Sequence, residues 1–181
     1  MKQLHRFIPS PRAGKRFINI YRLLRASVKE KERDAFVGSK EGGSYQTAML
    51  LLAILTAYPD QATEIFRELI EEEPTGEWSE FCAAYEARML AEGSEASDSR
   101  PGTSQKIGKT RNPEQKAAVG KDGSLEAGGE NDKTEWTELF ARLEDIEESV
   151  GGRPMGEFLE WAPRVARYSF QSGRVLYYQH E

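Results

Sequence analysis

The sequence has little of the chemistry that catalytic and metal sites use. Cys82 is the only cysteine in 181 residues, and the two histidines, His5 and His180, lie near opposite ends. One cysteine excludes an internal disulfide and fits a reducing compartment, so we expect a cytoplasmic protein. A zinc site needs more Cys and His ligands than these. Because no nucleophile, base and orienting group recur together, we expect no catalytic residue, no metal ligand and no enzyme activity.

Long apolar runs are also missing. The longest, residues 48–55, is much shorter than the roughly 20 residues that cross a bilayer, so it predicts a buried core helix and no transmembrane segment. No secretory signal is visible either. Charged residues make up 30% of the chain and its net charge is -5, which argues against nucleic acid as a general partner.

Apolar residues recur at helical spacing through most of the chain. The pattern predicts helices over residues 11–28, 45–57, 60–73, 77–91 and 133–148. A sixth helix should follow Pro154, and Pro163 should kink or split it. The charged run 29–34 has no apolar anchor and should end the first helix, while the aromatic residues 168–178 could be extended. We therefore expect an all-α fold, a small helical bundle.

Composition changes abruptly after residue 91. From Glu92 to about Asn131 the chain has almost no large apolar residue, so it cannot bury enough surface to offset its chain entropy and should be disordered. The expected organisation is a helical domain over residues 1–91, a disordered linker over 92–131, and a helical C-terminal segment over 132–181 that packs on the first part.

The first predicted helix is unusual because its first turn is basic. Arg12, Lys15, Arg16 and Asn19 recur at i, i+3, i+4 and i+7, which places them on one face. The helix dipole favours acids at this end, and Arg and Lys donors suit phosphate oxygens. Two interpretations stay open: the face forms ion pairs with an acidic helix of this chain, or it contacts the anionic group of a nucleotide or neighbouring domain.

Residues 11–19, PRAGKRFIN, followed by YRLL at 21–24, resemble the helix that follows the nucleotide-binding core in KAP-type P-loop NTPases. Residues 45–59 and 165–170 are similar to C-terminal parts of bacterial proteins with such domains. The resemblance implies a non-catalytic, lid-like helical region in which Arg12, Lys15 and Arg16 are candidates to contact nucleotide phosphates. Walker A and Walker B motifs are absent from this sequence. The resemblance therefore implies that ATP is not bound by this chain alone, and that it is contacted in trans or in a longer protein.

The alternative function is a stand-alone helical module that binds another protein. Trp161, Tyr168, Phe170 and Tyr178 supply aromatic side chains of the kind enriched at interfaces. The same aromatic residues could instead pack into the core of the chain, and the sequence leaves both interpretations open.

Overall fold

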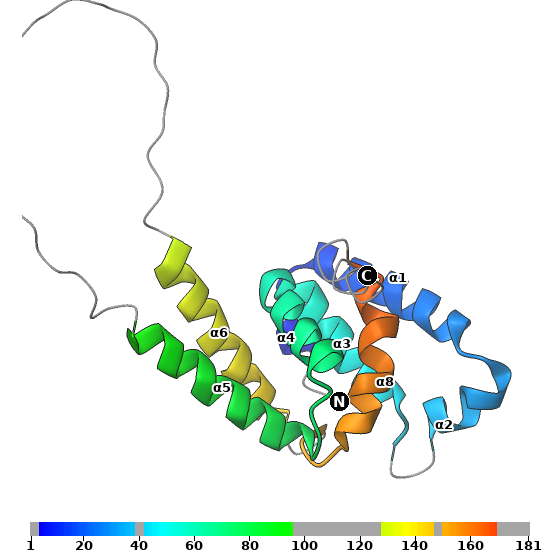
Figure 1. Ribbon diagram of the computed structural model, residues 1–181. Coiled ribbons are helices and arrows are strands. Elements are labelled where there is room, and N and C mark those ends of the chain that lie inside the picture. The colour runs from blue at the N-terminus through cyan, green and yellow to red at the C-terminus, as the bar shows by residue number, and fades with distance from the viewer. Residues whose placement is uncertain (1–3, 39–41, 96–127, 147–149, 170–181) are drawn as a thin grey trace, which may run out of the picture.

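The computed structural model describes residues 4–38, 42–95, 128–146 and 150–169 (Figure 1). These residues confirm the predicted all-α bundle. In chain order the helices are η1 (Leu4–Phe7), α1 (Pro11–Ser27), η2 (Glu30–Glu32), α2 (Arg33–Val37), α3 (Tyr45–Ala57), α4 (Pro59–Glu71), α5 (Trp78–Glu95), α6 (Gly128–Glu144) and α8 (Met155–Ala166). Most of the predicted linker, residues 96–127, and the aromatic residues 170–178 lie outside the described part of the chain.

Helix α3 is the centre of the bundle because it is apolar on nearly every side. Helices α1, α4 and α8 pack against it, and α8 also packs against α4. Eight α3 side chains are buried: Thr47, Ala48, Leu50, Leu51, Leu52, Ala53, Ile54 and Leu55. Burying one large aliphatic side chain contributes about 1.5–3 kcal/mol, so α3 supplies a large share of the hydrophobic stabilisation.

The turn from α3 into α4 follows directly from the sequence. Pro59 opens α4 at a position where the missing N–H removes no helical hydrogen bond. Beyond it, Ile65, Phe66 and Leu69 recur at helical spacing and are buried, while Glu64 and Glu71 face water. This amphipathic pattern fixes which face of α4 meets α3 and α8.

Helices α5 and α6 lie side by side as a hairpin on one side of the molecule (Figure 1). The base of the hairpin is held by backbone hydrogen bonds, in which Trp78 N donates to Arg153 O at 3.0 Å and Met155 N donates to Gly76 O at 2.9 Å. The Trp78 ring also stacks on Phe158 with the centroids 4.0 Å apart. The hairpin is therefore anchored where it leaves and rejoins the bundle.

Three details differ from the sequence prediction. After α1 the charged run forms η2 and α2 because Phe36 supplies an apolar anchor, 5.1 Å from the Trp161 ring. Pro163 does not split α8, which continues from Met155 to Ala166 and ends three residues after this proline. Helices α5 and α6 also extend into the predicted linker, over residues 92–95 and 128–131, because each added residue of a formed helix gains a hydrogen bond.

Candidate functional site: the outer face of α1

Helix α1 begins with a complete N-terminal cap. The Ser10 hydroxyl accepts a hydrogen bond from Ala13 N at 3.2 Å, and Pro11 occupies the first turn. Capping satisfies one of the free N–H groups of the first turn and stabilises the helix by about 1 kcal/mol. The first turn contains no acidic residue. The cap therefore fixes where α1 begins, while the positive charge of the first turn interacts unfavourably with the helix dipole.

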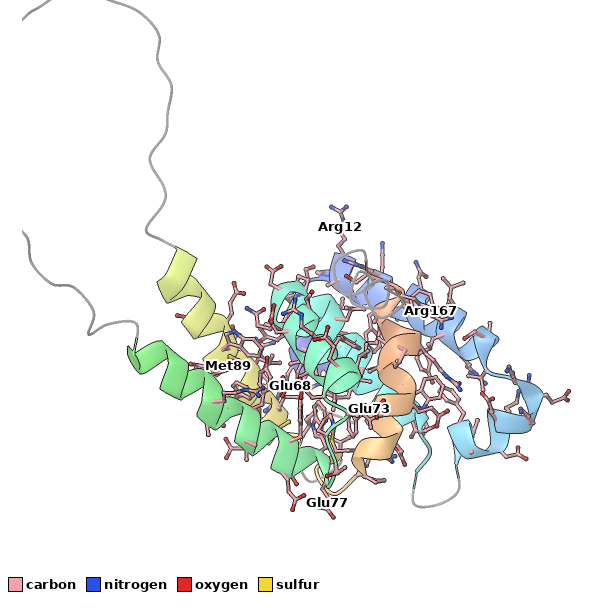
Figure 2. The ribbon with its side chains drawn as sticks, in the orientation of Figure 1. Arg12, Glu68, Glu73, Glu77, Met89 and Arg167 are labelled. Carbon is pink, nitrogen blue, oxygen red and sulfur yellow. The ribbon has the colours of Figure 1, made fainter. Side chains whose placement is uncertain are left out.

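The two faces of α1 differ completely in character. Phe17, Ile20 and Leu24 are buried against the bundle, at the helical spacing that the sequence shows. The opposite face carries the polar and basic side chains, all of them exposed: Arg12, Lys15, Arg16, Asn19, Arg22 and Arg25. Figure 2 shows Arg12 pointing away from the helical body. The structure thus places all four predicted anion-contacting residues together on one accessible surface, which we call the α1 basic face.

None of the five cations on the α1 basic face forms an ion pair with a residue that the structure describes. Most of the described arginines outside α1 behave differently. Six of them have a carboxylate partner: Arg6, Arg67, Arg88, Arg142, Arg153 and Arg164. The interpretation in which this face binds an acidic helix of the same chain therefore finds no ion pair in the described ranges.

The chemistry available on the α1 basic face is anion recognition. Arg12 and Arg16 each offer a planar fork of donors that can hold two oxygens of one phosphate or carboxylate. Lys15 adds a compact charge between them, and Asn19 adds a neutral amide donor one turn further along. Because all four side chains are exposed, they can approach an anion held by another molecule.

The predicted partner-binding aromatic residues are placed differently. Trp161 is only 2% exposed, packs on Phe36 and has the Arg164 guanidinium 4.8 Å from its ring centre. Of the two interpretations that the sequence leaves open for Trp161, this burial favours packing in the core. Tyr168 is half-buried against the core. Phe170 and Tyr178 lie outside the described residues.

Sequence reasoning overlooked two exposed apolar side chains on α1. Ile18 is 49% exposed and Leu23 is 59% exposed, and both flank the basic side chains. The helical spacing could have predicted their exposure, because neither residue falls on the buried stripe of Phe17, Ile20 and Leu24. The α1 basic face therefore combines cations with accessible apolar surface.

The remaining titratable groups do not converge in the described part of the chain. No three His, Cys, Asp or Glu side chains there could hold a metal ion. Cys82 is half-buried and borders a groove between α5 and α6. Burial, with a smaller contribution from Glu64, raises the pKa of Tyr85 to about 12. None of the described helices has the length and apolar character that crossing a membrane requires.

Comparison with protein-family models, curated proteins and solved structures finds no match to this chain. Its function must therefore be argued from the α1 basic face itself.

Proposed function

We propose that this chain is a non-catalytic helical module whose α1 basic face contacts the phosphates of a nucleotide bound to a P-loop NTPase core. The core would belong to another polypeptide or to another part of a longer protein, in the cytoplasm. The observation that carries the proposal is the set of five exposed α1 cations without an ion pair to any described residue. The resemblance of residues 11–24 to the helix behind such a core supports the choice of partner.

The physical argument starts from the cost of the arrangement. Cations in the first turn of α1 oppose the helix dipole, by about 0.3–1 kcal/mol each at an exposed site. A phosphate oxygen would offset this, because hydrogen bonds to charged groups contribute about 1.5–3 kcal/mol. An exposed face of this kind suits contact in trans, in which a positioned arginine stabilises charge on a nucleotide that another domain binds. In this proposal the chain holds no nucleotide alone and changes the turnover of its partner.

The test uses the neighbouring coding sequence, which we expect to encode Walker A and Walker B motifs. ATP turnover by that purified protein is measured with and without this chain. The chain should change the turnover, and the combined change Arg12→Ala, Lys15→Ala and Arg16→Ala should abolish its effect. The matched control removes the same charge from exposed positions outside α1: Lys29→Ala, Lys31→Ala and Arg33→Ala.

The control chain should act like the wild type. Equal effects of the two triple variants on turnover would sink the proposal, as would an unchanged effect of the α1 variant. Circular dichroism of both variants separates loss of contact from loss of fold, and we expect unchanged spectra because every altered side chain is exposed.

A further inference from the structure

A second surface lies on the α5–α6 hairpin. It is an open groove of about 360 Å³ along the seam of the two helices. Cys82 and Ala83 of α5 and Phe140 and Ala141 of α6 line its middle. The two alanines leave room for a side chain of another molecule to enter between the helices.

Only acidic side chains carry charge in the lining of this groove. Glu86 and Glu144 border it, and neither forms an ion pair with a described residue. The two arginines in the described part of the hairpin are engaged elsewhere. Arg88 pairs with Glu68 of α4 at 2.8 Å, and Arg142 pairs with Glu138 and stacks over the Tyr58 ring. The groove therefore presents two carboxylates without a countercharge.

The two carboxylates lie at opposite ends of the groove. Figure 1 shows α5 and α6 running antiparallel. Tyr85 contacts Trp136, with the ring centroids 5.5 Å apart, so the next residue, Glu86, lies toward the N-terminal side of α6. On α6 the residue at about the level of Glu86 is Thr137, the neighbour of Trp136. Glu144 lies seven residues beyond Thr137, near the start of α5. At 1.5 Å per residue, seven residues of helix span about 10 Å.

The α1 basic face has a matching pattern. Lys15, Ile18, Arg22 and Arg25 follow one another at intervals of three, four and three residues, so they form one stripe. Lys15 and Arg22 are also seven residues apart, or about 10 Å along the axis, and Ile18 lies between them. The two cations on either side of Ile18 therefore have the same spacing along α1 as the two carboxylates have along the groove.

From this complementarity we propose that α1 of one copy docks in the α5–α6 groove of a second copy. Ile18 enters the groove between Ala83 and Ala141, while Lys15 and Arg22 pair with Glu144 and Glu86. An isologous contact between two such grooves would instead bring the carboxylates of both copies together, which is repulsive. The charges of the two surfaces therefore select α1 as the occupant.

This contact is heterologous, because each copy uses a different surface. Helix α1 and the hairpin lie on different sides of the molecule (Figure 1), so a docked pair keeps one free α1 and one free groove. Further copies can therefore add, and the assembly is either a closed ring or an open filament. Resting on the proposed function, the contact also regulates it, because an α1 docked in a second copy cannot reach a nucleotide.

The test measures mass by sedimentation velocity on the full chain, over a concentration series at low salt. The wild type should gain mass with concentration and lose this gain at high salt, because exposed ion pairs are screened. A groove variant, Glu86→Lys with Glu144→Lys, and an α1 variant, Lys15→Glu with Arg22→Glu, should each stay monomeric. Their equimolar mixture should associate again, since each α1 then meets a groove of opposite charge on the other variant.

The matched control carries the same charge reversal outside the groove, Glu72→Lys with Glu73→Lys, and should associate like the wild type. A wild type that stays monomeric throughout, a groove variant that associates like the control, or a mixture of the two variants that stays monomeric would overturn the proposal. None of these results bears on the turnover test with the Arg12, Lys15 and Arg16 variant in dilute solution. Failure of self-association is thus separate from failure of the proposed function.

Discussion

Helices α1 and α3 pack against each other, yet their sequences are governed by different requirements. Helix α3 has no charged residue and is buried on nearly all sides. Helix α1 has five cations and no acid, and buries only the stripe that meets the bundle. The apolar residues of α3 are explained by packing alone.

The outer face of α1 is not explained by packing. Its cations contact no described carboxylate, and those in the first turn oppose the helix dipole. A side chain that contributes nothing to the fold and carries a small cost points to a role outside the fold. This contrast is the reason for placing the function on α1 and the stability on α3.

The largest expected effect is in α3. Leu51 is fully buried, so Leu51→Ala should lower the free energy of unfolding by about 3–5 kcal/mol through lost transfer energy and a residual cavity. Urea unfolding followed by circular dichroism measures the change. The matched control is Leu23→Ala on α1, where an exposed side chain should cost no more than about 0.5 kcal/mol. Similar losses at the two positions would contradict the comparison.

A smaller effect is expected at the polar contact that joins α3 to α8. The Thr47 hydroxyl donates to Glu157 Oε2 at 2.8 Å, and Arg153 Nη1 donates to the same oxygen at 2.7 Å. Glu157→Ala leaves the partly buried Arg153 without its carboxylate and should cost about 2 kcal/mol. Glu157→Gln retains an acceptor and should cost less. If Glu157→Ala unfolds at the same urea concentration as Glu71→Ala, an exposed control, the contact has no role in stability.

On α1 the comparison predicts a variant that is more stable than the wild type, in contrast to the two destabilising changes above. Arg12→Glu puts an acid in the first turn, where the dipole favours it, and should raise the free energy of unfolding by about 0.3–1 kcal/mol at low salt. Arg25→Glu makes the same charge change in the last turn and should lower it by a similar amount. Thermal unfolding of the two variants measures both. Shifts in the same direction would show that the dipole is not their cause.

A further prediction concerns Tyr85 on α5, whose side chain is buried in the core. Its pKa of about 12 in the folded protein exceeds the value near 10 of an unfolded chain. Above pH 10 the unfolded chain loses this proton first, so the stability contributed by Tyr85 falls as the pH rises from about 10 to 12. Below pH 10 it is fully present.

Tyr85→Phe removes that proton and should make stability fall less steeply over the same range. Urea midpoints at a series of alkaline pH values, compared between the two proteins, measure the difference in slope. Parallel pH profiles would contradict the assigned shift in pKa.

Much of this fold could be predicted from local sequence. Apolar periodicity located the main helices, and Pro59 marked the start of α4 to within one residue. Phe36 was overlooked as an anchor because a single aromatic in a charged run has no periodic signal, and its partner Trp161 is 125 positions away. Such contacts depend on which helices meet, and one helix's pattern does not determine that.

The candidate site could also be predicted only in part, because local spacing shows which residues share a face but not which helices meet it. Helical spacing alone placed Arg12, Lys15, Arg16 and Asn19 on one face, and the structure shows that face exposed. Whether acidic helices would neutralise it depended on the tertiary arrangement. Trp161 is of a residue type that is enriched at interfaces, but it lies in the core. Residue type alone does not distinguish an interface position from a core position.

The base of the α5–α6 hairpin has a consequence for how this protein can change. Ser79 N donates to Gly151 O at 3.0 Å, beside the bonds of Trp78 and Met155, so the chain leaves the bundle and returns at one place. The hairpin between these points packs on the bundle through Tyr85, Leu139 and Phe140, while its two ends are held together at that place. The entropy of closing such a loop grows only with the logarithm of its length, about 0.6 kcal/mol for each doubling. Residues 96–127 are thus a site where evolution, or an engineer, can lengthen or replace the chain at little cost to the bundle.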